Sequence, residues 1–319
     1  MKVIGLDIGF GTTKVAYDGG ISVFPSVVGT DTTRQQVDGL LDAQMDVVTI
    51  DGRSYCVGAG AVKHSSRWIN SRDRGWIHTV AFRALVTHAL EVANARSCSV
   101  IIVTGLPITH YSSDRNQLVG IIRRIADAYS IDLTVKVILQ PLGSFFRLLL
   151  NDEGIVADAE LTSGKTGVLD IGFFTTDFLT LADLELMELQ SDSCESGAST
   201  VLEAISTDIA DQYGIRLDIN AVENAVRNSS LRLYGKDVDI SGTVDRRLSE
   251  FAAEITAKAK TVWKSAADID RIIITGGGAE LLKGKLDLYR HAFLCQNAQT
   301  ANAEGYFRFG RRIANEKSD

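Results

Sequence analysis

The sequence predicts an α/β protein with two domains, on three observations. The chain has 319 residues, of which 45% are hydrophobic and 23% charged, a globular composition with enough apolar side chains for two cores. Strand-like apolar runs alternate with helix-like segments. The segment VIGLDIGFGTTK, residues 3–14, returns in closely similar form as TGVLDIGFFTTD, residues 166–177, so that each half carries the same strand and turn.

Apolar runs and turn residues predict the elements of the first half. Short apolar runs bounded by Gly or Pro favour strands, Asp-Gly pairs favour hairpin turns, and apolar residues at helical spacing favour helices. In order, the patterns predict a strand at 2–8, hairpins at 14–26 and 47–58, a helix at 79–95, a strand at 99–107, a helix at 112–129, a strand at 134–141 and a helix from 143. Ser112 or Ser113 is the expected cap of the helix at 112–129.

The second half repeats the scheme after a polar crossing at 151–165. An apolar run ending in Gly predicts its first strand, and an alternating segment predicts the second. The expected elements are a strand at 166–172, a strand at 174–181, a helix at 198–213, a helix at about 243–265, a strand at 271–275, the triplet Gly-Gly-Gly at 276–278 and a helix at 279–284.

Charge and cysteine usage exclude several classes of protein. The net charge of -7 argues against nucleic acid or an anionic membrane as a direct partner. The apolar runs fall short of membrane-spanning length, and the start lacks the apolar core of a signal peptide. The four cysteines form no Cys-x-x-Cys pair, which indicates free thiols in a reducing compartment. A cytoplasmic protein is expected.

The repeated turn has the residues that a phosphate site needs. Small residues let backbone N–H groups approach phosphate oxygens, and Thr hydroxyls add donors. An Asp at the end of the strand cannot bind phosphate directly, but it can hold Mg²⁺, which bridges to phosphate oxygens. The first copy ends in Lys14, a cation suited to phosphate, and the second ends in Asp177. Two such turns facing each other could bind one polyphosphate from both sides.

Simpler interpretations compete with this one. A single Asp-x-Gly turn after a strand is most often only a hairpin, but two matching copies favour function. The turn at 9–14 also resembles the start of a dinucleotide fingerprint, yet Lys14 replaces its third Gly and a strand follows. Residues 163–166 resemble the end of a Walker A loop, but Ala159 replaces its first Gly and the segment precedes a strand.

Four motifs together carry a family resemblance. DIGFGTTK resembles the first phosphate loop of the superfamily of actin, heat-shock chaperones and sugar kinases, and VLDIGFFTTDF resembles its second. IIITGGGAELL is similar to the adenosine loop, and ILQPLGSFF to the connecting segment in which actins carry a Gln. FPSVVG, VGAGAV and ANAEGYFRFG further resemble the bacterial and archaeal actin-like proteins typified by ParM, also called StbA, which segregate plasmids.

The resemblance implies a two-domain actin-like ATPase fold, of the ribonuclease-H-like kind, with nucleotide in the cleft between the domains. The expected domain I covers residues 1–160 plus 300–319, and domain II covers 161–299. Actins have Asp and His where this chain has Phe173 and Asp177, so its water network is expected to differ from that of actin.

The resemblance also implies roles for single residues. Asp7 and Asp170 would hold Mg²⁺, largely through water. Gln140 would orient the attacking water, and Asp177 matches a chaperone-type Asp near that water. Without the resemblance, Gln140 before a Pro would be taken as a strand end. The residues that would contact the nucleotide are Gly9, Gly11, Thr12, Thr13, Lys14, Gly172, Thr175, Thr176, Gly276, Gly277 and Gly278.

The expected function is that of a nucleotide-dependent, filament-forming ATPase. ATP and Mg²⁺ are the expected cofactors, and GTP stays possible because the adenosine-loop contacts are mostly backbone. The expected partners are further copies of the chain and a DNA-binding adaptor protein, through which the filament would move plasmid DNA. The alternatives are a small-molecule kinase, a chaperone-like ATP switch that does not polymerise, and a nucleotide-binding scaffold without turnover.

Overall fold

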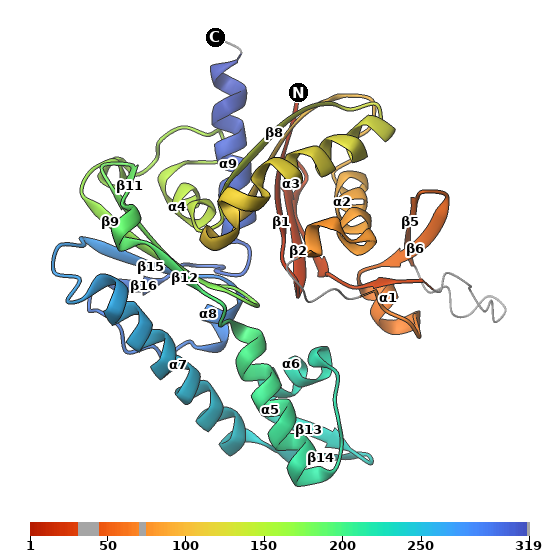
Figure 1. Cartoon of the computed structure of the whole chain (residues 1–319), viewed down its shortest axis with the longest axis vertical. Helices are drawn as coiled ribbons and strands as arrows, with labels where there is room; N and C mark the ends of the chain where they lie inside the picture. Colours follow the sequence, from red (N-terminus) through yellow and green to blue (C-terminus); the bar gives the residue numbers. More distant parts are fainter. Residues whose placement is uncertain (31–44, 70–74, 318–319) are drawn as a thin grey trace. The chain divides into compact units, whose positions relative to one another are not determined.

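The chain divides into two compact units. The computed structural model describes residues 1–30, 45–69 and 75–317. Unit 1 comprises Met1–Asp158 and Asn302–Asp319, and unit 2 comprises Ala159–Ala301. Both units combine a mixed sheet with helices, which is the α/β class that the sequence predicts (Figure 1). Within the described residues, no helix is both long and apolar enough to cross a membrane.

Unit 1 is built on a five-stranded sheet with the order β3-β2-β1-β7-β8. β1, β7 and β8 run parallel, whereas β2 is antiparallel to both β1 and β3. The strands are β1 (Lys2–Ile8), β2 (Thr12–Tyr17), β3 (Gly20–Pro25), β7 (Ser99–Leu106) and β8 (Asp132–Leu139). The carboxyl ends of the three parallel strands therefore share one edge of the sheet, the edge at which open α/β sheets bind ligands.

Helices cover both faces of this sheet (Figure 1). On one face, Leu6 packs in a core with α2 and α3, and on the other, Val3 packs in a core with Tyr306 of α9. Because successive residues of a strand alternate between faces, two covered faces explain why the whole interior of β1 is buried. The helices are α2 (Val80–Val92), α3 (Ile108–Ala128), α4 (Leu142–Leu149) and α9 (Ala301–Glu316).

A smaller three-stranded sheet completes unit 1, with the order β4-β6-β5. The hairpin predicted around residues 47–58 is present in it, with Asp51 at positive φ in the turn. Its elements and their neighbours are β4 (Val28–Gly29), β5 (Asp46–Ile50), β6 (Arg53–Val57), α1 (Ala59–His64) and the 3-10 turn η1 (Trp76–His78).

The sheet of unit 2 repeats that of unit 1. Its order is β11-β10-β9-β15-β16, with β12 added beside β10. β9, β15 and β16 run parallel and β10 is antiparallel to β9, as for the matching strands of unit 1. The strands are β9 (Lys165–Ile171), β10 (Thr176–Ala182), β11 (Glu185–Leu186), β12 (Asp192–Cys194), β15 (Arg271–Thr275) and β16 (Ala292–Leu294). The sequence repeat is thus part of a repeated sheet topology.

The helices of unit 2 form one core with its sheet. Leu169 and Phe178 of the sheet pack in a cluster with Ile205, Phe251 and Trp263 from the helices. The remaining elements are η2 (Ala159–Thr162), η3 (Glu188–Gln190), α5 (Ala198–Tyr213), α6 (Ile219–Asn228), β13 (Ser230–Leu233), β14 (Lys236–Asp239), α7 (Ser241–Trp263) and α8 (Gly277–Leu281).

Some predicted details are wrong. Neither Ser112 nor Ser113 caps α3, because the helix begins at Ile108 after Pro107, whose carbonyl accepts from the His110 N–H at 3.0 Å. The Ser113 hydroxyl instead donates to the His110 carbonyl inside the helix. The segment at 174–181 alternates in sequence, yet β10 is buried on both faces. Its threonines are accommodated because their hydroxyls find partners, as at Thr180 with the Gln190 carbonyl at 2.6 Å.

Candidate functional site

The turn between β1 and β2 brings an acid and a base together. The Gly9 N–H donates to the Thr12 carbonyl at 3.2 Å and closes the turn. Asp7 and Lys14 are direct cross-strand partners, so their side chains leave the same face of the hairpin. Lys14 Nζ donates to Asp7 Oδ2 at 3.1 Å, and both residues are 8% exposed. The ion pair holds two buried charges at the carboxyl end of β1.

Ser26, the residue directly after β3, holds this first turn in place by hydrogen bonds. The Ser26 hydroxyl donates to the Gly9 carbonyl, and the Ser26 N–H donates to the Gly11 carbonyl at 3.0 Å. The Thr13 hydroxyl lies 2.9 Å from the Ser26 hydroxyl and is fully buried. Ser26 thus makes three hydrogen bonds to the turn. Sequence reasoning missed it, and the only signal was its place in the FPSVVG segment.

The turn between β9 and β10 has the same backbone and different side chains. The Gly172 N–H donates to the Thr175 carbonyl at 2.8 Å, matching the first turn. Asp170 and Asp177 are direct cross-strand partners, each 1% exposed. The Thr175 hydroxyl donates to Asp177 Oδ2 at 3.4 Å. The second turn therefore sets two carboxylates opposite each other where the first has a carboxylate and an ammonium group.

The start of α5 supports the second turn. The N–H groups of Ala198 and Ser199 donate to the carbonyls of Gly172 and Phe173 at 3.0 and 2.8 Å. Gly197 allows this approach, because a Cβ there would lie 2.6 Å from the Phe173 carbonyl oxygen. The loop carbonyls thus use the first free N–H groups of the helix. Sequence reasoning missed this support, although a Gly directly before a predicted helix was a signal.

The glycine triplet lies against the second turn. Thr275 at the end of β15 pairs with Asp170 on β9, so both strands end at the same edge. Gly276 has φ of +92°, and a Cβ there would lie 2.4 Å from Asp170 Oδ1. A Cβ at Gly278 would lie 2.6 Å from Ile171 Cγ2, whereas one at Gly277 meets nothing closer than 4.0 Å. Gly276 and Gly278 are required by packing, whereas a Cβ at Gly277 would meet only Gln299 Cγ at 4.0 Å.

Gln140 lies beyond the end of β8, at the same sheet edge as the first turn. Its N–H donates to the Leu106 carbonyl at 2.8 Å, and its carbonyl accepts from the Tyr306 hydroxyl at 3.0 Å. Gly105 makes room for this contact, since a Cβ there would lie 1.9 Å from the Tyr306 hydroxyl. Among the described residues, the Gln140 side-chain amide has no hydrogen-bond partner, so a fixed backbone presents an uncommitted donor and acceptor.

The candidate residues fall into two sets, one in each unit. Unit 1 brings together the first turn and Gln140, and unit 2 brings together the second turn and the glycine triplet. Two hydroxyls among them are committed to the fold: that of Thr13 to Ser26, and that of Thr176 to the Ser196 carbonyl at 2.6 Å. Side chains alternate between the two faces along a strand. The Thr12 hydroxyl therefore lies on the same face as Lys14, and the Thr175 hydroxyl on the same face as Asp177.

The donor set fits Mg²⁺ better than a metal held wholly by protein. No group of three or more His, Cys, Asp or Glu side chains able to hold a metal occurs in the part of the chain that the structure describes. Asp7 and Asp170 each offer a buried carboxylate at a strand end. Mg²⁺ is bound through one or two carboxylates while it keeps several waters and contacts substrate phosphates. Each unit therefore supplies one carboxylate of the kind that Mg²⁺ uses.

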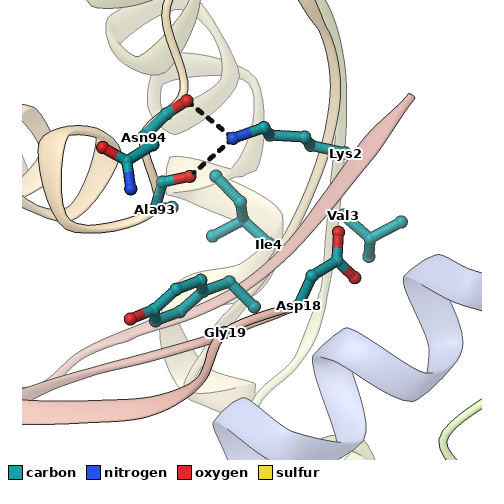
Figure 2. A pocket seen from close by; sticks show the side chains of 8 residues that line it. Lys2, Val3, Ile4, Asp18, Gly19, Ala93 and Asn94 are labelled. Carbon is teal, nitrogen blue, oxygen red and sulfur yellow. Dashed lines mark hydrogen bonds between the residues drawn. The ribbon is translucent and has the colours of Figure 1, made fainter.

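A pocket at the opposite edge of the unit 1 sheet is a weaker candidate (Figure 2). It lies at the amino-terminal end of β1, beside the turn that holds Asp18. Lys2 Nζ donates to the carbonyls of Ala93 and Asn94 at 3.2 and 2.7 Å. The lysine thereby satisfies carbonyls at the end of α2, which is a structural role.

Comparison with known proteins identifies the fold and family. Residues 5–143 match the N-terminal domain of actin-like proteins, and residues 168–288 match the C-terminal part of archaeal MreB-like actin homologues. A Thermoplasma acidophilum protein described as an archaeal actin homologue is 25% identical over 331 residues, covering 96% of this chain and 98% of the relative.

Two solved structures share the fold over nearly their whole length. A 15-stranded ParM filament from Clostridium botulinum has a TM-score of 0.75 at 20% identity, covering 98% of this chain and 99% of the other. An archaeal actin homologue in complex with ADP has a TM-score of 0.71 at 21% identity, covering 99% and 100%. The likeness to these structures shows the fold, and the two domain matches show that this chain belongs to the actin-like proteins.

Proposed function

We propose that this chain binds Mg-ATP, hydrolyses it, and assembles into filaments while the nucleotide is bound. One observation carries the proposal: the same turn, closed by the same Gly N–H to Thr carbonyl bond, occurs in both units with an Asp in the same register position. Two buried carboxylates and two hydroxyl-bearing turns are what one Mg-polyphosphate would use.

The nucleotide would be held by residues of both units. Asp7 and Asp170 would bind Mg²⁺ through water, and the cation would offset the charge of the phosphates when bound. Lys14 would add a second positive charge, and its pairing with Asp7 keeps it in place before nucleotide arrives. The hydroxyls of Thr12 and Thr175 would donate to phosphate oxygens, while Thr13 and Thr176 would act through the backbone that their hydroxyls fix.

Two further sites would bind the nucleobase and position the attacking water. Gly277, where an added Cβ would meet only Gln299 Cγ at 4.0 Å, would lie against the adenosine, with contacts mostly to backbone, which leaves GTP use possible. Gln140 would orient the attacking water through its side-chain amide. Such positioning groups account for most of what a protein adds to phosphoryl transfer. Asp177, beside Asp170, would contact the same water from unit 2.

Filament formation is proposed from the family. The Clostridium botulinum relative is a ParM filament, and the archaeal relative was solved with ADP. A contact between unlike surfaces that does not close into a ring propagates as a helix. We propose that the filament moves plasmid DNA through a DNA-binding adaptor, since the net charge of -7 disfavours direct binding to DNA.

The deciding experiment compares the assembly of the chain in the presence of different nucleotides. Light scattering, sedimentation and negative-stain microscopy would follow the purified chain with Mg-ATP, Mg-GTP, Mg-ADP, a non-hydrolysable ATP analogue, and ATP with EDTA. Filaments are expected with Mg-ATP and with the analogue, and fewer with Mg-ADP or EDTA. Monomers in every sample would overturn filament formation. ATP turnover without assembly would favour a chaperone-like switch, and turnover only with an added small molecule would favour a kinase.

A further inference from the structure

The turn after β16 is bound to the glycine triplet. β16 lies beside β15 and runs parallel to it, so both strands end at the same edge of the unit 2 sheet (Figure 1). The Ala298 carbonyl accepts from the Gly276 N–H at 3.2 Å and from the Thr275 hydroxyl at 3.4 Å. The turn therefore lies against the segment that the proposed function assigns to the adenosine.

Gln299 belongs to this turn and stands on a fixed backbone. Ala298, the residue before it, is 1% exposed, and the Thr300 N–H after it donates to the Asn297 carbonyl at 2.9 Å. Asn297 has φ of 54°, a conformation that Asn adopts more readily than most residues. The fold thus sets the position from which the Gln299 side chain leaves the turn.

The Gln299 side chain lies next to Gly277. A Cβ added at Gly277 would meet Gln299 Cγ at 4.0 Å. Gln299 is half-buried, and its side-chain amide makes no hydrogen bond within the described part of the chain. A primary amide carries an N–H donor group and an acceptor oxygen. A donor and an acceptor, neither of them used by the fold, therefore stand beside the glycine.

Adenine and guanine differ at the six-position of the purine ring in a way that such an amide can read. Adenine carries an amino group there, which donates, and guanine carries a carbonyl oxygen, which accepts. Gln can meet either base, because a rotation of its amide exchanges the donor for the acceptor. The side chain at position 299 can therefore determine which of the two bases the site accepts.

We propose that Gln299 contacts the six-position substituent of the purine and lets the site accept both ATP and GTP. Its side-chain oxygen accepts from the adenine amino group, or its amide N–H donates to the guanine carbonyl. Gln299 is thus the specificity-determining residue of the nucleotide site. This inference rests on the proposed function, since it requires the nucleobase to lie against Gly277.

Opposite charges at position 299 test the contact. In Gln299→Glu the carboxylate only accepts, and in Gln299→Lys the ammonium group only donates. Equilibrium titration of the full chain with Mg²⁺ and non-hydrolysable analogues of ATP and GTP gives the ratio of the two affinities. Wild type should bind both nucleotides with affinities within about tenfold of each other. Gln299→Glu should shift the ratio about tenfold toward ATP, and Gln299→Lys about tenfold toward GTP.

Gln296 supplies the matched control. It is a glutamine of the same turn, and it is exposed. Gln296→Glu and Gln296→Lys add the same charges nearby. Because ATP and GTP carry the same triphosphate, a general effect of the added charge changes both affinities alike. The ratio should therefore stay within about twofold of wild type, and shifts as large as those of the Gln299 variants would overturn the inference.

A nucleotide analogue tests the contact without adding a charge. Purine riboside triphosphate carries only hydrogen at the six-position, so it offers Gln299 neither the amino group nor the carbonyl. It should bind wild type about tenfold more weakly than ATP. Gln299→Ala removes the side-chain amide, and this variant should bind the two nucleotides with equal affinity.

The outcomes separate this inference from the proposed function. Binding of ATP with a ratio to GTP that neither charged variant at position 299 changes would overturn the inference and leave the function standing. A wild-type chain that binds only one of the two nucleotides would do the same. A folded wild-type chain that binds neither would overturn both. Thermal unfolding shows whether each variant is folded, and if the charged variants are not, the comparison of wild type with Gln299→Ala decides.

Discussion

Asp170 and Asp177 lie directly opposite each other on β9 and β10, and each is only 1% exposed. The matching residues of unit 1 are Asp7 and Lys14, which form an ion pair at 3.1 Å. One backbone register thus carries a neutralised pair in unit 1 and two carboxylates in unit 2. In unit 2 no lysine lies in the cross-strand position that Lys14 occupies in unit 1.

Asp170→Asn should abolish Mg²⁺-dependent ATP turnover in a chain that still folds. The amide keeps the size of the side chain and removes the charge that would hold the cation. Turnover with and without EDTA, together with thermal unfolding, measures both effects. Asp192→Asn, which alters a half-buried pair with Lys258 at 2.6 Å, is the control. Unchanged Mg²⁺-dependent turnover would remove Asp170 from the site.

Gln140→Ala should slow hydrolysis by on the order of 10²-fold and leave nucleotide affinity unchanged. The side chain acts on the attacking water and not on the bound ground state, and lost positioning typically has this size. Single-turnover hydrolysis and equilibrium binding of a fluorescent nucleotide separate the two quantities. Filaments of this variant should outlive those of wild type. Equal losses of affinity and rate would contradict the role.

Gly277→Ala and Gly278→Ala should fail in different ways. At Gly278 a Cβ meets Ile171 Cγ2 at 2.6 Å, and such overpacking costs about 1–3 kcal/mol of stability. At Gly277 a Cβ meets only Gln299 Cγ, at an ordinary contact distance of 4.0 Å, so the fold should be as stable as wild type. The same methyl group should weaken nucleotide binding roughly tenfold if adenosine lies there. Full affinity in a stable Gly277→Ala chain would place the base elsewhere.

Asp208→Asn should lower stability by about 1 kcal/mol at pH 7, and the loss should vanish in acid. Asp208 accepts from Arg247 Nη2 and Nε, both at 2.7 Å, and from Arg246. The Arg247 hydrogen bond holds the pKa of Asp208 below its ordinary value of 3.8. Between the lowered pKa of the folded state and the ordinary pKa of the unfolded state, the folded state therefore binds fewer protons. The stability that Asp208 contributes is present above pH 3.8 and is lost as the pH falls through the folded-state pKa.

Urea unfolding of wild type and Asp208→Asn between pH 7 and pH 3 measures this dependence. The difference in free energy of unfolding should stay constant down to about pH 5 and then shrink. Glu223→Gln, which alters the i,i+4 pair with Arg227 on α6, is the control and should cost only about 0.3 kcal/mol. A difference that grows toward acid pH would contradict the assigned sign.

Much of the fold could be predicted because its signals are local. Helix α5 occupies residues 198–213 as predicted, since helical periodicity runs between Gly197 and Gly214, whose φ is +69°. The buried strands were predicted from their apolar runs, since burial on both faces demands such runs. The hairpin of β13 and β14 was missed because its four-residue strands are short and mostly exposed, which leaves no apolar pattern to detect.

The supports of the candidate site could not be predicted, because they join segments far apart in the chain. Tyr306 fixes the Gln140 backbone across 166 positions, and a Cβ at Gly143 would meet the Asn302 backbone. Nothing near Gln140 in the sequence indicates that its backbone is held in this way. That support comes from α9, which is remote in the sequence.

By itself, the sequence determined the repeated turn, the residue types in it and the α/β class, since each depends on neighbours within one strand or one helical turn. The tertiary structure decided which hydroxyl of each Thr-Thr pair is committed to the fold, because Thr13 meets Ser26 and Thr176 meets the Ser196 carbonyl only once the strands pair. It also set Asp170 against Asp177, since cross-strand register is fixed by the burial of whole faces and not by either residue alone.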